Sequence, residues 1–176
     1  MIPAPSPPPI PVALVPVTVS EVGLVRGMAC RIWPLAYDGI IPASQIDYML
    51  DRMYSEETLS DEIGVKNIDY RWIVVGGEKV GFLAAGPVVE GGVCPLHKFY
   101  LLPEAQDRGI GSATLAAFIS LAASAAVAAL ELRVNRHNTR AIALYRKAGF
   151  VISREDCLEI GGGFVMDDYV LQRAVP

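Results

Sequence analysis

The stretch of residues 109–130 constrains the fold most, because it contains no charged residue and is long enough to cross a bilayer. Most of its residues are Ala, Ser, Gly and Thr, and large apolar side chains are too few for membrane insertion. We therefore expect a helix buried inside a water-soluble domain, and no membrane partner. Strand-like runs at 96–102 and 130–134 flank this helix, so it belongs to a domain that combines a sheet with helices.

Length and composition predict one globular domain. The chain has 176 residues, of which 52% are hydrophobic and 19% charged, enough apolar material for a single core. A net charge of -4 without any basic run argues against a nucleic-acid partner. Three widely spaced cysteines, Cys30, Cys94 and Cys157, suggest neither a disulfide framework nor a zinc site. The N-terminal residues lack the basic region of a signal peptide, so we expect a cytoplasmic protein.

The order of the expected elements predicts an α/β (mixed α+β) fold with a mostly antiparallel central sheet flanked by helices. Residues 1–11 form a Pro-rich tail, expected as polyproline II or disorder, and the folded domain is 12–176. A strand at 12–19 precedes a helix that starts at Ser20 and ends before Pro34. Further helices are expected at 42–53 and, capped by Ser55, up to Gly64. A hairpin follows at 72–75 and 79–85, and the last strands begin at Phe150.

A short polar loop joins the strand at 96–102 to the uncharged helix. The first N–H groups of a helix have no intrahelical partner, and glycine lets a phosphate approach the main chain closely, so this loop is a candidate pyrophosphate site. A plain strand-to-helix turn remains the alternative. A Walker loop is excluded because no lysine follows the glycines. A dinucleotide fingerprint fits poorly, because Thr114 replaces its third glycine, and only Glu131 favours it. The candidate residues are Gln106, Asp107, Arg108, Gly109, Ile110 and Gly111.

A second motif follows the next strand and carries the sequence V-N-x-x-N-x-x-A-x-x-x-Y-x-x-x-G-F at 134–150. Asn138 and Tyr145 are seven residues apart, so a helix places them on nearly one face, where both can reach one ligand. Together with the Q-x-x-G-x-G loop at 106–111, this motif resembles the GNAT superfamily of acetyl-CoA-dependent N-acetyltransferases. The resemblance extends over about residues 12–173 and is most diagnostic at 87–150.

The resemblance implies a single GNAT-like domain that uses acetyl-CoA and no metal. In it, the Q-x-x-G-x-G loop binds the pyrophosphate of CoA, Asn138 binds the pantetheine side, and Tyr145 is the general acid for the leaving thiolate. It also assigns pantetheine and thioester binding to main-chain groups of Phe99, Tyr100 and Leu101, on a strand that is often bulged there. From the residues alone, Asn138 also fits a helix cap and Tyr145 a half-buried core aromatic.

The amine that attacks the thioester must lose a proton, and His97 is our candidate base. It stands where polyamine acetyltransferases of the superfamily carry a glutamate. Arg133 stands where peptide N-terminal acetyltransferases place their glutamate, which weakens that assignment. Glu131 and a water chain are the alternatives to His97. For the substrate end we expect aromatic and acidic side chains that suit a cationic amine, with core packing and a solvated turn as the alternative explanation: Trp33, Tyr37, Tyr48, Asp167 and Asp168.

The sequence therefore predicts an enzyme that transfers an acetyl group from acetyl-CoA to a primary amine, with a small cationic amine or polyamine favoured. The amine attacks directly in a ternary complex. Alternatives are an amino-acid or peptide N-terminal acetyltransferase, a non-catalytic CoA-binding sensor and, third, a nucleotide-binding oxidoreductase. The presence of Tyr145 argues against the sensor. A small-molecule amine is the expected partner, and a homodimer is compatible with the sequence.

Overall fold

The computed structural model describes residues 10–175. Most of the Pro-rich tail expected at 1–11 lies outside the described residues. Ile10 precedes the first strand and packs against the core formed with the N-terminal helices.

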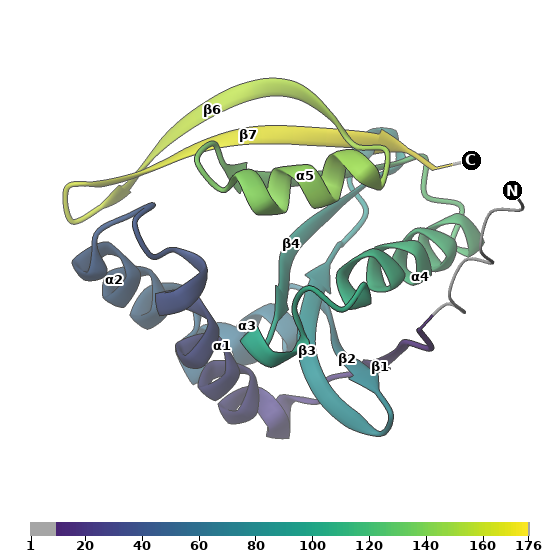
Figure 1. Cartoon of the computed structure of the whole chain (residues 1–176), viewed down its shortest axis with the longest axis horizontal. Helices are drawn as coiled ribbons and strands as arrows, with labels where there is room; N and C mark the ends of the chain where they lie inside the picture. The colour runs from purple at the N-terminus through teal and green to yellow at the C-terminus, as the bar shows by residue number, and fades with distance from the viewer. Residues whose placement is uncertain (1–9, 176) are drawn as a thin grey trace, which may run out of the picture.

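A seven-stranded sheet forms the centre of the domain, in the order β1-β2-β3-β4-β5-β7-β6 (Figure 1). All neighbouring strands pair antiparallel except β4 and β5, which pair parallel. The predicted mostly antiparallel α/β fold is confirmed. The strands are β1 (Ala13–Pro16), β2 (Asp69–Val75), β3 (Glu78–Ala85), β4 (Val93–Leu101), β5 (Ala129–Asn135), β6 (Val151–Gly161) and β7 (Phe164–Ala174).

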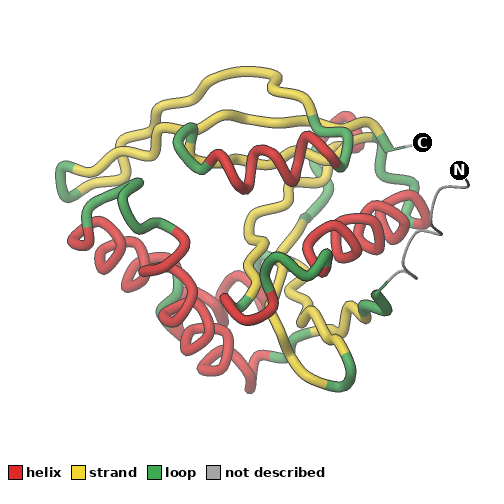
Figure 2. Tube along the Cα trace, in the orientation of Figure 1, coloured by secondary structure: helices red, strands yellow, loops and turns green. Residues whose placement is uncertain are grey.

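Within residues 10–175, five α-helices accompany the sheet, and their segments are clear in Figure 2. They are α1 (Val22–Ala36), α2 (Ala43–Met53), α3 (Glu56–Gly64), α4 (Ile110–Ser124) and α5 (Thr139–Lys147). The predicted cap of α3 is present, since the Ser55 hydroxyl accepts a hydrogen bond from Thr58 N. Within residues 10–175, no helix combines the length and apolar character needed to cross a membrane.

The prediction that the first helix ends before Pro34 was wrong, because α1 continues to Ala36. Proline lacks the N–H that would bond to the carbonyl four residues earlier, yet its φ is compatible with a helix. Near the helix end this loss matters little, and Tyr37 N closes the last turn on Trp33 O at 3.0 Å. Trp33 and Tyr37 therefore both lie at the C-terminal end of α1.

Two hydrophobic cores lie on the two faces of the sheet. Side chains of α1, α2 and α3 fill one of them together with β2 and β3, around Trp33, Tyr54 and Phe82. Side chains of α4 and α5 fill the other, with Leu115 and Phe150 fully buried. The largest side chains of both cores are removed from water, which is the main favourable contribution to folding. Helices therefore cover the central strands on both faces.

Candidate active site

The strands β4 and β5 separate at the centre of the sheet. Their parallel pairing covers only four residue pairs, from Val93–Ala129 to Leu96–Leu132. Beyond these pairs β4 continues along β3 and β5 continues along β7. The second half of β4 therefore has no sheet neighbour on its β5 side among residues 10–175, and its main chain is available there to a ligand. The side-chain amide of Gln106 donates to Leu101 O at 3.0 Å.

A β-bulge at His97 marks the start of this separation. Ala84 pairs with Lys98 and Ala85 with Leu96, so His97 is the extra residue on β4. The bulge reverses the alternation of side chains: Leu96 is buried in the core with α4 and α5, whereas Lys98 contacts Glu62 of α3. His97 is exposed, borders the cleft described below, and has Nε2 2.7 Å from Gly86 O. Its neutral ring then offers only Nδ1 as a proton acceptor.

A cleft of about 980 Å³ extends along the separated strands to the ends of α1, α4 and α5. Its lining brings together most of the residues expected at the site, both those expected to bind CoA and those expected to bind the acceptor. From the candidate sets it includes Trp33, Tyr37, His97, Phe99, Tyr100, Leu101, Gln106, Asp107, Gly109, Gly111, Asn138, Tyr145 and Asp168. Four candidates are absent from the lining: Tyr48, Arg108, Ile110 and Asp167.

The loop before α4 has the backbone expected of an anion site. Gly109 is the N-cap of α4 with φ +78°, and Asp107 also has a positive φ, +58°. The first N–H groups of α4 follow directly, where the helix dipole is positive. Arg140, at the start of α5, pairs with Asp107 at 2.9 Å and ties the loop to that helix.

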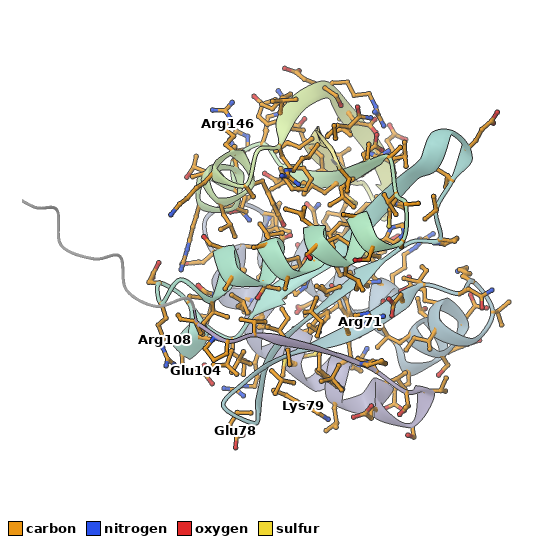
Figure 3. All side chains as sticks on the ribbon, turned by 90° about the vertical axis from the view of Figure 1, so that its right-hand side faces the viewer. Arg71, Glu78, Lys79, Glu104, Arg108 and Arg146 are labelled. Atoms are coloured by element: carbon orange, nitrogen blue, oxygen red, sulfur yellow. The ribbon has the colours of Figure 1, made fainter. Side chains whose placement is uncertain are left out.

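Three residues of the Q-x-x-G-x-G motif at 106–111 differ in their surroundings. Ile110 is buried in the core, and Arg108 is exposed at the surface, on the same side as Glu104 in Figure 3. A Cβ on Gly111 would lie 3.2 Å from Leu144 Cδ2. Packing of α4 against α5 therefore favours a glycine here, because a Cβ would require the Leu144 side chain to shift.

Asn138, directly before α5, and Tyr145, within α5, both line the cleft. The side-chain oxygen of Asn138 accepts a hydrogen bond from Ala141 N at 3.1 Å, so this residue is the N-cap of α5. Tyr145 is 8% exposed, and its ring lies 6.3 Å from that of Phe99 and 5.8 Å from that of Phe150. Burial, and secondly Tyr37, raise the pKa of Tyr145, so its hydroxyl keeps its proton at neutral pH.

The opposite end of the cleft is aromatic. The ring of Trp33 lies 4.7 Å from Tyr37 and 5.7 Å from Tyr100, and the hydroxyls of the two tyrosines are 3.2 Å apart. Tyr48, expected here, instead donates from its hydroxyl to Ile160 O at 2.7 Å and holds α2 to the β6–β7 hairpin. Asp167, also expected here, pairs with Arg136 at 2.7 Å. Asp168, by contrast, is 4% exposed and lines the cleft.

A buried polar triad beside the cleft was not expected from the sequence. Lys98 Nζ lies 2.5 Å from both Glu62 Oε2 and Tyr70 OH, and the Tyr70 hydroxyl also donates to Glu62. Burial lowers the pKa of Lys98, and the carboxylate of Glu62 opposes this effect. The three residues belong to α3, β2 and β4, and no local motif signals that they meet. Among residues 10–175, no group of three or more His, Cys, Asp or Glu side chains is arranged to hold a metal ion.

Comparison with known proteins agrees with this geometry. The sequence profile of the acetyltransferase (GNAT) family matches residues 38–150, which include the separated strands, the α4 loop and α5. The chain belongs to the GNAT family of acetyltransferases. Both motifs from which the resemblance was inferred, at 106–111 and 134–150, lie inside the matched range.

Individual relatives of this GNAT domain share less sequence. A mycothiol acetyltransferase of Clavibacter michiganensis subsp. michiganensis is 40% identical over 62 residues, which are 35% of this chain and only 20% of that protein. The fold is similar to that of PaiA N-acetyltransferase from Thermoplasma acidophilum in complex with coenzyme A, with a TM-score of 0.77, 20% identity and coverage of 94% and 99% of the two chains. It is also similar to that of spermidine N-acetyltransferase from Vibrio cholerae, in complex with CoA and spermine. There the TM-score is 0.70 and the identity 14%, over 93% of this chain and 95% of that one.

Proposed function

We propose that this GNAT protein transfers an acetyl group from acetyl-CoA to a primary amine in a ternary complex. One observation carries the proposal: a single cleft joins the N-terminus of α4, the unpaired half of β4, the Tyr145 hydroxyl and an aromatic end with a buried carboxylate. The first two features fit the pyrophosphate and pantetheine of CoA, and the last fits a cationic amine. The PaiA structure that shares the fold contains coenzyme A.

In this mechanism the chain binds, orients and moves protons. The N–H groups at the start of α4 hold the pyrophosphate, and Gly109 gives the loop its left-handed turn. Main-chain groups of Phe99, Tyr100 and Leu101 hold the pantetheine and the thioester. A main-chain N–H there stabilises the negative charge that develops on the carbonyl oxygen. Tyr145, kept protonated by its surroundings, gives its proton to the CoA sulfur as the C–S bond breaks.

The proposed acceptor is a small cationic amine or polyamine. The cleft offers three aromatic rings and a carboxylate at one end, and an ammonium group is attracted by both. Arg133, which also lines the cleft, already pairs with Asp156. A polyamine acceptor would also agree with the spermidine acetyltransferase that shares the fold. The amine's proton has two candidate acceptors in the cleft, Nδ1 of His97 and the carboxylate of Asp168.

A turnover screen tests the proposal directly. CoA release from acetyl-CoA is followed with a thiol reagent, in parallel for spermidine, free amino acids and a short peptide that begins with alanine. We expect the highest kcat/KM with spermidine. A higher value for an amino acid or the peptide would support an amino-acid or peptide acceptor instead.

Thermal unfolding with added CoA or NAD provides the second readout, because a ligand that binds only the folded state raises Tm. We expect CoA to raise Tm and NAD to leave it unchanged. A rise with CoA without turnover of any amine would point to a sensor, and a rise with NAD alone would refute the CoA site.

A further inference from the structure

Asp168 differs from every other carboxylate around the cleft because it has no partner. It lies on β7, is 4% exposed and lines the cleft. Within the described residues 10–175, no side chain or main-chain donor forms a hydrogen bond or an ion pair with its carboxylate. A buried carboxylate without a partner is costly, and such groups cluster at functional sites.

The neighbouring cation Arg133 acts on the Asp168 carboxylate through its charge but forms no ion pair with it. Opposite it across the strands lie Asn135 of β5 and Asp156 of β6. Asp156 already pairs with Arg133, on the same face of β5. Asp167, the preceding residue, projects from the other face of β7, where it pairs with Arg136. The two adjacent aspartates of β7 therefore have different partners and different surroundings.

Asp168 acts electrostatically on Tyr37, which lines the same cleft as Tyr145. Burial, and then the carboxylate of Asp168, raise the pKa of Tyr37, while the hydrogen bond with Tyr100 lowers it. Burial, and then Tyr37, raise the pKa of Tyr145. Tyr37 is thus within electrostatic reach of both the carboxylate and the proposed acid. Asp168 and Tyr145 lie on different elements, β7 and α5, and both line the cleft between them.

We propose that Asp168 binds the ammonium group of the acceptor and takes its proton, so that it is the general base of the acetyl transfer. This inference rests on the proposed function, and in it the acceptor amine binds in its protonated form. The ammonium contacts the Asp168 carboxylate, with the rings of Tyr37 and Tyr100 beside it. His97 then has a structural role in the bulge, through its contact with Gly86 O.

The proton steps balance as follows. One proton moves from the ammonium to Asp168, which leaves a neutral amine and a carboxylic acid. The amine nitrogen attacks the thioester carbonyl and forms the C–N bond, and the C–S bond then breaks as Tyr145 gives its proton to sulfur. The second proton of the nitrogen returns to Tyr145, and Asp168 releases its proton to water after the products leave.

The buried setting favours the first of these steps. Transfer within the ammonium–carboxylate pair removes two charges from a site of low dielectric, which lowers its cost relative to water. Burial, opposed by Arg133 and reinforced by Asp156 and Asp167, raises the pKa of Asp168 to about 6. The carboxylate is therefore mostly ionised at neutral pH and is a better base than an exposed aspartate.

The test compares the pH dependence of kcat/KM in four proteins, with the amine of the screen that has the highest kcat/KM. These are the wild type, Asp168→Asn, His97→Ala and Glu155→Gln. Glu155 pairs across the strands with Tyr169, on the face of the β6–β7 hairpin opposite to that of Asp168. Glu155→Gln therefore changes an exposed carboxylate to an amide away from Asp168. The amine is the same throughout, so its own ionisation contributes equally to every profile.

We expect Asp168→Asn to lower kcat/KM about 100-fold or more near pH 7.5 and to lose the rise through pH 6, because general bases typically contribute about 10² to 10⁴. The other two variants keep that rise, and calorimetry finds CoA affinity within about twofold in all four proteins. A rise that persists in Asp168→Asn, or that disappears in His97→Ala instead, would overturn the inference and leave the proposed function intact. Absence of turnover in the wild type would overturn both.

Discussion

Asp168→Asn should make the folded protein more stable at neutral pH while it lowers activity. In the folded protein, the pKa of this carboxyl is raised from its ordinary value of 3.8 to about 6, mainly by burial. The unfolded chain therefore ionises at lower pH than the folded chain. Stability falls as the pH rises through the window from 3.8 to 6, and above it the cost stays constant. An asparagine carries no charge and does not incur this cost.

The size of the effect follows from the shift in pKa. Each unit corresponds to about 1.36 kcal/mol, so the difference between 3.8 and 6 amounts to about 3 kcal/mol at full effect. The carboxylate faces a cleft that is open to water, and screening by that water reduces the cost. We therefore expect Asp168→Asn to gain about 1 to 3 kcal/mol near pH 7.5, or roughly 2 to 4 °C in Tm for each kcal/mol.

Urea unfolding of both proteins near pH 7.5 and near pH 4 measures this effect. The gain should be present at the higher pH and largely absent at the lower one, where the folded wild type is protonated. Glu155→Gln, which changes an exposed carboxylate, should differ little from the wild type at either pH. Equal or lower stability of Asp168→Asn at pH 7.5 would refute the argument, because it would mean that the carboxylate has a stabilising partner.

Three further variants test other parts of the site. Tyr145→Phe keeps the ring between Phe99 and Phe150 but removes the proton donor. We expect kcat to fall while the Kd for CoA, measured by calorimetry, stays nearly unchanged. Turnover at the wild-type rate would mean that water protonates the thiolate. Gly109→Ala places a side chain at φ +78°, so it should lower the free energy of unfolding by urea by about 1 to 2 kcal/mol and weaken CoA binding. Gly27→Ala, in an open position of α1, should not destabilise the fold. Equal effects of the two substitutions would contradict the reasoning. Glu62→Gln leaves the buried Lys98 ammonium without its counter-charge and should lower the free energy of unfolding by about 3 kcal/mol or more. This loss should exceed that of Lys98→Met. A smaller loss for Glu62→Gln would show that water solvates Lys98.

The sequence determined those parts of the protein whose cause is local. The Ser55 cap needs only the residues of the next turn, and Gly109 and Asn138 begin their helices for equally local reasons. The seven-residue spacing of Asn138 and Tyr145 places both side chains on one face of α5, since the helix repeat alone decides it. The residue types of the two motifs were therefore sufficient to predict the family and the fold, and both motifs contribute residues to the lining of the cleft. Pro34 was an exception, because a proline near the end of a helix forfeits only one hydrogen bond.

Tertiary structure alone decided which polar residues meet in the cleft. Asp167 and Asp168 are adjacent and chemically identical, yet the pleat of β7 directs one to Arg136 and the other into the cleft. Which face is the cleft depends on the pairing of β7 with β5, whose residues lie more than thirty positions earlier. The bulge at His97 likewise reverses the side chains of β4 and directs Lys98 to Glu62. Such contacts arise from strand register and packing between distant segments, and no local pattern in the sequence encodes them.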